Sequence, residues 1–159
     1  MKIKKESFDS SVAPCDIEFV KWEDKYVTGI KLIDSQHREL VILANQLYQA
    51  CCGGNEEVGT VFKDSMSRMV EYVRFHFGAE QSLLERINFP YHREHKAKHD
   101  ALVKKILAAA MDYNEGKKFV PNQFVRTLKD WVFGHIAVED KIYAAYAREQ
   151  TKKGLLTGL

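Results

Sequence analysis

The chain has 159 residues, of which 45% are hydrophobic and 29% are charged, so its length and composition suit a single globular domain with a substantial buried core. Its 24 basic and 22 acidic residues are well mixed and leave a net charge of +2, which argues against a nucleic acid partner. Because no run approaches the roughly 20 apolar residues of a membrane span, and none of signal-peptide length lies near the start, we expect a cytoplasmic protein without membrane insertion.

An N-terminal arm is expected over residues 1–30. Its aromatic residues, Phe19, Trp22 and Tyr26, would pack over one end or side of the domain. The first helix is predicted from Asp34, with Asp34 or Ser35 as its N-cap and a stop at Gly53-Gly54. Its apolar positions recur at helical spacing: Leu40, Leu43, Ala44, Leu47 and Tyr48.

Three more helices follow from the same 3.6-residue periodicity. The second is predicted over Val58–Ile87. The third opens at Pro90 and ends near residues 114–116, and the fourth opens at Pro121 and fades past Tyr146. Four amphipathic helices with short loops bury their apolar faces most economically as an up-down-up-down bundle. The prediction is therefore an all-α domain over residues 1–159, with the four-helix bundle in residues 31–150.

Histidines lie on the apolar face of every predicted helix. His95 and His99 are four residues apart, a spacing that places both imidazoles on one helix face. His76 and Glu80 have the same spacing, and a buried carboxylate is costly unless it is paired or binds a cation. The first helix adds His37, and the fourth adds His135 with Glu139 and Asp140 just beyond it. A lone core histidine is usually satisfied by a hydrogen bond, but five in one bundle with two carboxylates indicate a metal site.

The residue types narrow the choice of metal. Imidazole suits Fe, Zn, Cu or Ni, carboxylates can bridge two hard ions, and no cysteine lies on the inward faces. A structural zinc ion uses four ligands in a closed tetrahedron and would leave several of these groups without a role. The surplus of ligands therefore favours a dinuclear centre.

The order of these motifs resembles the hemerythrins, most closely the single-domain bacteriohemerythrins. The matching segments are DSQH with His37, His76-xxx-Glu80, His95-xxx-His99 and His135-xxxx-Asp140. The resemblance implies two iron ions: His95, His99 and His135 would hold one, and His37 and His76 the other. Glu80 and Asp140 would bridge both ions, together with an oxo or hydroxo group.

The same resemblance implies reversible O2 binding. One iron would have a filled coordination shell, and the other would keep one open position for O2 as a ligand. Trp131 and Val132 fall where the family places apolar pocket residues, and Ile33 or Phe77 could add to the wall, although simple core packing accounts for them equally well. We expect an oxygen carrier, store or supplier rather than an enzyme.

Two residues near the implied ligands have alternative interpretations. By spacing alone, Glu139 aligns better with His135 than Asp140 does, because on an ideal helix Asp140 lies about 140° round the axis from His135. The family pattern selects Asp140. His92, three residues before His95, has no role in that pattern, and we expect it to face solvent or to begin the helix.

Two other functions stay open. An O2- or redox-sensing signalling module would require a separate partner protein. A di-iron peroxidase or nitric-oxide-handling protein would use the open iron, but apart from His92 and exposed carboxylates no general acid or base remains once the ligands are assigned. Cys15, Cys51 and Cys52 lack metal-type spacing, and we expect reduced thiols rather than redox or regulatory ones.

Overall fold

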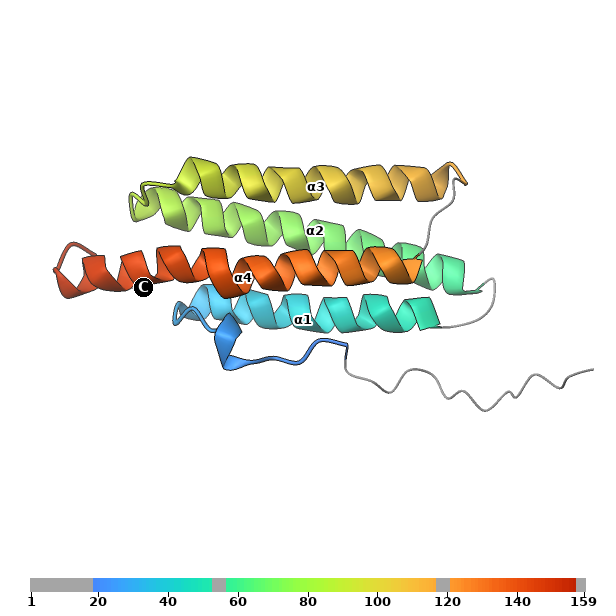
Figure 1. Ribbon diagram of the computed structural model, residues 1–159, viewed down its shortest axis with the longest axis horizontal. Helices are drawn as coiled ribbons and strands as arrows, with labels where there is room; N and C mark the ends of the chain where they lie inside the picture. Colours follow the sequence, from blue (N-terminus) through green and yellow to red (C-terminus); the bar gives the residue numbers. More distant parts are fainter. Residues whose placement is uncertain (1–18, 53–56, 117–120, 157–159) are drawn as a thin grey trace, which may run out of the picture.

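The computed structural model describes residues 19–52, 57–116 and 121–156. Four long helices run side by side along the molecule (Figure 1): α1 Lys31–Cys52, α2 Glu57–Arg86, α3 His92–Asn114 and α4 Pro121–Lys152. A short 3-10 helix, η1 Asp24–Tyr26, precedes them. These described ranges contain no strand, and the predicted all-α four-helix bundle is confirmed.

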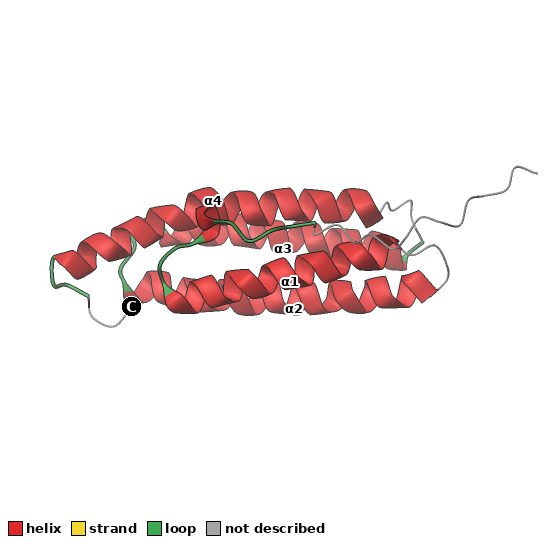
Figure 2. Cartoon of the chain, turned by 90° about the horizontal axis from the view of Figure 1, so that it is seen from below, coloured by secondary structure: helices red, strands yellow, loops and turns green. Residues whose placement is uncertain are grey.

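The helices are arranged in up-down-up-down order. α1 contacts α2 and α4, and α3 contacts the same two helices. Figure 2 shows the bundle from below, with α1 beside α2 and α3 beside α4. Successive helices are antiparallel because short connections join them. Within the described ranges, none of the helices combines the length and apolarity that crossing a bilayer requires.

Two apolar clusters fill the bundle, and a layer of polar side chains separates them. On α1, His37 lies between Ile33 of the smaller cluster and Leu40 of the larger one. On α2, His76 and Glu80 lie between residues of the same two clusters. Apolar packing on both sides therefore fixes the height along the bundle at which the polar side chains meet.

α1 begins at Lys31 rather than at Asp34, and Asp34 is not the N-cap. Its carboxylate instead accepts hydrogen bonds from the Thr28 backbone N–H (2.6 Å), the Thr28 hydroxyl (2.7 Å) and the Gly29 N–H (3.0 Å). Gly29 has a φ of +84°, in the left-handed region that glycine adopts without strain. The chain before the helix thus turns back onto a carboxylate of the first helical turn, where the helix dipole also favours negative charge.

The α2–α3 connection explains why α3 begins at His92 and not at Pro90. Asn88 adopts a φ of +53°, the Asn88 N–H donates to the Glu85 carbonyl (3.0 Å), and the Phe89 N–H donates to the Leu84 carbonyl (2.9 Å). These two bonds form the closing motif of a helix C-terminus. Phe89 is buried in the smaller cluster, so the chain needs two further residues before it can start the next helix.

α4 is longer than its sequence pattern indicates. It continues to Lys152 instead of fading past Tyr146, and Ala147 extends its buried face beyond that residue. Gly154, with a φ of +71°, follows its end, and the Leu155 N–H donates to the Gln150 carbonyl (3.0 Å). A small alanine side chain carries little hydrophobic signal, so the apolar pattern in the sequence ends before the helix does.

The described part of the expected arm, residues 19–30, lies along the side of the bundle. Phe19 stacks on Tyr48 of α1 with ring centroids 4.0 Å apart, and Tyr26 packs against Phe133 of α4 at 5.3 Å. Residues 1–18 of the expected arm lie outside the described residues. The aromatic side chains of this segment therefore close the seam between α1 and α4.

Of the three cysteines, the structure describes the side chain of Cys51 alone. The half-buried Cys51 thiol donates to the Leu47 carbonyl oxygen at 3.3 Å. Cys15 and the side chain of Cys52 lie outside the described part of the chain. The expectation of reduced thiols stays a prediction.

We predict that Asp34→Ala lowers the free energy of unfolding by about 2 kcal/mol, because Thr28 and Gly29 lose their charged acceptor. Urea denaturation followed by circular dichroism measures the change. Ser35→Ala is the matched control. Among the described residues the exposed Ser35 hydroxyl bonds only to the Leu32 carbonyl of its own helix, at 2.8 Å, so its effect should stay within about 0.5 kcal/mol. Equal losses in the two variants would contradict this role of Asp34.

Candidate metal centre

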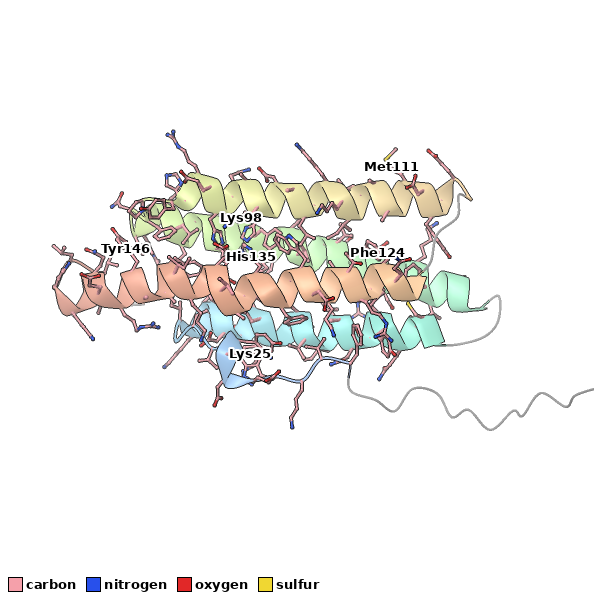
Figure 3. The ribbon with its side chains drawn as sticks, in the orientation of Figure 1. Lys25, Lys98, Met111, Phe124, His135 and Tyr146 are labelled. Carbon is pink, nitrogen blue, oxygen red and sulfur yellow. The ribbon has the colours of Figure 1, made fainter. Side chains whose placement is uncertain are left out.

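The polar layer of the bundle contains every side chain that the sequence analysis assigned to a metal site. All are buried, with exposed fractions from 0% to 7%. Each of the four helices contributes at least one of them: His37, His76, Glu80, His95, His99, His135 and Asp140. In Figure 3, His135 lies among side chains inside the bundle, whereas Met111 is on the outer side of α3.

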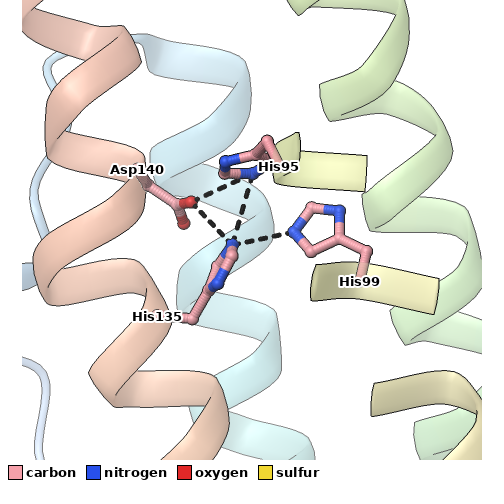
Figure 4. Close-up of side chains that lie close together, drawn as sticks. All are labelled: His95, His99, His135 and Asp140. Carbon is pink, nitrogen blue, oxygen red and sulfur yellow. Dashed lines mark hydrogen bonds and ion pairs between the residues drawn. The ribbon is translucent and has the colours of Figure 1, made fainter. Parts of the chain in front are cut away.

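The first group of side chains comprises His95 and His99 from α3 and His135 and Asp140 from α4, with one ligand atom of each within 4.8 Å of the others. The His135 Nε2 atom is 2.9 Å from His99 Nε2 and 3.2 Å from His95 Nε2. Asp140 Oδ1 is 3.2 Å from His135 Nε2 and 3.5 Å from His95 Nε2. Figure 4 shows these ring nitrogens and the carboxylate directed at one another.

The second group comprises His37 from α1 and His76 and Glu80 from α2, whose ligand atoms also lie within 4.8 Å of one another. The two imidazole rings meet edge to face with centroids 4.8 Å apart. His76 Nε2 is 3.7 Å from Glu80 Oε2. This group therefore offers two imidazoles and one carboxylate, one imidazole fewer than the first group.

The two carboxylates join the groups. Asp140 directs Oδ2 at His37 Nε2 of the second group (3.3 Å) and Oδ1 at His95 and His135 of the first. Glu80 Oε2 is 3.4 Å from His99 Nε2, besides its contact with His76 in its own group. Each carboxylate thus touches imidazoles of both groups.

Hydrogen bonds among the described residues leave part of this layer without partners. Buried polar atoms normally have partners, but among the described side chains both ring nitrogens of His37, Glu80 Oε2 and both carboxylate oxygens of Asp140 have none. Where imidazole nitrogens face each other at 2.9 Å, as in His99 and His135, a proton can serve only one pair at a time. Lone pairs directed at common points are what a cation satisfies, and imidazole with carboxylate is a donor set that fits iron or zinc.

Burial keeps imidazoles of the layer in the form that binds metals. Burial lowers the pKa of His76 from 6.5 to about 4, against the opposing effect of Glu80. It lowers the pKa of His99 from 6.5 to about 2. Both rings are neutral near pH 7, so neither has to lose a proton before its nitrogen can bind a cation.

The carboxylates, in contrast, keep their charge. Burial alone would raise the pKa of Asp140, but the imidazoles of His135 and His37 outweigh it and hold that pKa below its ordinary value. The pKa of Glu80 is also lowered, because neighbouring histidines, His76 foremost, outweigh burial and the repulsion from Asp140. Among the described residues no lysine or arginine is buried. A bound metal cation would neutralise two buried anions that have no lysine or arginine beside them.

Two residues of the layer were missed by the sequence analysis. The hydroxyl of the fully buried Tyr143 donates to Glu80 Oε1, and burial raises its pKa well above the ordinary value, so it stays a donor. Gln36 is also buried, and its Oε1 lies 3.0 Å from His76 Nδ1. The available signals were the position of Gln36 inside DSQH and of Tyr143 one helical turn after Asp140.

Aromatic rings cover the first group. Phe77 stacks on His99 with centroids 3.5 Å apart, and the half-buried Trp131 stacks on His135 at 4.7 Å. Val132 and Ile33, the other predicted pocket residues, are buried in the larger and the smaller apolar cluster respectively. All four side chains pack in or against the apolar core. That they also line an O2 pocket stays a prediction.

Asp140 rather than Glu139 lies in the cluster, and His92 lies outside it. Asp140 is fully buried, whereas Glu139 is half-buried and pairs with Lys98 at 2.6 Å outside the cluster. His92 is the first residue of α3, as expected, and its Nδ1 lies 3.4 Å from Gln81 Nε2. Within the described ranges, neither Glu139 nor His92 belongs to a group of potential metal ligands.

Comparison with known proteins agrees with this arrangement. The family model of the hemerythrin HHE cation binding domain matches residues 28–147. A bacteriohemerythrin of Stenotrophomonas maltophilia is 28% identical over 85% of this chain and 91% of its own. A bacteriohemerythrin of Clostridium acetobutylicum is 30% identical over 77% of this chain and 96% of its own. The crystal structure of a wild-type hemerythrin has the same fold, with a TM-score of 0.74, 24% identity and coverage of 80% of this chain and 96% of that chain.

We predict that Asp140→Ala loses most of the bound metal, because it removes the carboxylate that touches both groups. Glu139→Ala is the control, since Glu139 pairs with Lys98 outside the cluster, and it should retain the wild-type metal content. Elemental analysis of both purified variants measures the difference. Metal loss from Glu139→Ala with retention in Asp140→Ala would reverse the assignment.

Proposed function

Because the chain belongs to the hemerythrin family, we propose that it binds O2 reversibly at a centre of two non-haem iron ions. Proteins of this family are oxygen-binding metalloproteins that hold non-haem iron and are generally not enzymes. The count of two ions and the reversible binding of O2 are our proposal for this chain. The role that follows is that of an oxygen carrier, store or local supplier.

The observation that carries this proposal is the position of the Asp140 carboxylate. One of its oxygens faces His37 at 3.3 Å, and the other faces His135 at 3.2 Å. Residues that served one ion would need only one of these groups. A carboxylate with one oxygen toward each group supports two ions that share it.

The ligand set that we propose divides by helix pairs. His95, His99 and His135 would hold one iron, His37 and His76 would hold the other, and Glu80 and Asp140 would bind both. Iron(II) in such a pair supplies the electrons that O2 binding requires. Because the second group has one imidazole fewer than the first, it leaves room for an external ligand, and this side is where we place O2.

The protein itself contributes exclusion of water and fixed orientation. Every proposed ligand is at least nine-tenths buried, and the stacked rings of Phe77 and Trp131 cover imidazoles of the first group. A dry site slows proton-dependent side reactions that would make O2 binding irreversible. Tyr143 holds its proton on its own hydroxyl and directs it at Glu80 Oε1, which leaves Oε2 for the histidines.

We predict that the anaerobic iron(II)-loaded protein gains a visible charge-transfer band when O2 is added and loses that band when the solution is purged with argon. Absorption spectra over repeated cycles measure this reversibility, and metal-free protein is the control for scattering and free O2. A single, irreversible change to a ferric spectrum would contradict reversible binding. It would instead favour redox sensing or peroxidase-type chemistry.

A further inference from the structure

We propose that Gln36 is a positioning residue of the metal centre, whose amide oxygen fixes the tautomer and the orientation of His76. The inference rests on the proposed function only in that His76 is taken to bind iron. It adds a residue of α1 that touches no proposed ion but determines which nitrogen of the α2 imidazole is available to one.

The contact between Gln36 and His76 crosses from one helix to the next inside the polar layer. Gln36 is 4% exposed, His76 is 1% exposed, and Oε1 of the amide lies 3.0 Å from Nδ1 of the ring. An amide oxygen can only accept a hydrogen bond. Nδ1 must therefore carry the proton, and Nε2 keeps its lone pair.

The opposite edge of the same ring faces the centre. His76 Nε2 lies 3.7 Å from Glu80 Oε2, and the ring meets the His37 ring edge to face at 4.8 Å. Rotation of the imidazole about its stem would move Nε2 away from the centre and break the bond to Gln36 at the same time. Because a buried donor left without a partner costs about 1–3 kcal/mol, the bond to Gln36 holds the ring in the ligating orientation.

The contact with Gln36 fixes the orientation of one of the two imidazoles of the second group. Neither ring nitrogen of His37 makes a hydrogen bond among the described residues, so of its two imidazoles His76 is the anchored one. The anchor is also uncharged. The layer already contains the buried carboxylates of Glu80 and Asp140, and an amide orients His76 without adding a third negative charge next to them.

The tautomer is tested on full-length protein labelled with 15N at histidine, by NMR of the metal-free chain. We expect His76 to be protonated at Nδ1 in the wild type and to become a mixture of tautomers in Gln36→Leu. The His76→Asn variant identifies the signal. A wild-type His76 protonated at Nε2 would overturn the inference, because the amide would then be donating to the ring instead of accepting from it.

Metal affinity is tested by anaerobic competition for iron(II) with a chelator. We expect Gln36→Leu to weaken binding by about 10–100-fold, the usual effect of removing a partner that orients a ligand. Gln36→Glu should recover most of the affinity, because a carboxylate also accepts from Nδ1, and should lower the reduction potential through its added charge. Gln46→Leu makes the same change at a half-buried position further along α1, and it should bind iron as the wild type does.

The outcomes separate this inference from the proposed function. If the wild type shows no reversible O2 band while Gln36→Leu still changes the tautomer and weakens iron binding, the proposed function fails and the role of Gln36 stands. If Gln36→Leu binds iron like the wild type, the role of Gln36 fails, whatever the O2 spectrum shows. If Gln36→Leu does not fold, the wild-type tautomer and the recovery in Gln36→Glu decide.

Discussion

Two carboxylates buried in a helical bundle are the constraint on which the rest of this structure depends. Glu80 and Asp140 are both fully buried, and ions in such surroundings are tolerated only when they are paired or bind a cation. Apart from the Tyr143 hydroxyl, which donates to Glu80, their partners are imidazoles, and those of His76 and His99 are neutral near pH 7 because burial lowers their pKa values. Bound metal ions would neutralise the buried carboxylates, which accounts for a polar layer that apolar packing alone does not explain.

The bundle is built so that this layer can exist. Apolar clusters on either side close the core toward both ends and fix the layer in position. The two ligand groups are then supported differently: stacked rings of Phe77 and Trp131 cover the first group, whereas hydrogen bonds with Gln36, which accepts, and Tyr143, which donates, hold side chains of the second. Stacking excludes water, and hydrogen bonds fix orientation. The group that we assign to O2 is therefore the one whose geometry the protein controls through polar contacts.

Helical periodicity predicted the four helices and the inward placement of five histidines, because both follow from which residues share a helix face. It could not decide between Glu139 and Asp140. An ideal helix favours Glu139, and only the family pattern selected the residue that the structure buries. The start of α1 was wrong because hydrogen bonds from Thr28 and Gly29, not a local cap, determine it. Gln36 and Tyr143 were missed because a polar residue and an aromatic residue on a helix have no distinct pattern, and their roles come from partners on other helices.

The central claim is that two iron ions share the Asp140 and Glu80 carboxylates, and Mössbauer spectroscopy with magnetic susceptibility on the ferric protein tests it most directly. Two ions joined by shared ligands are magnetically coupled, so the account predicts two iron ions per chain and a ground state without net spin. Uncoupled high-spin ferric iron, or one ion per chain at saturation, would contradict it. That result would mean that the two groups of ligands do not act as one centre.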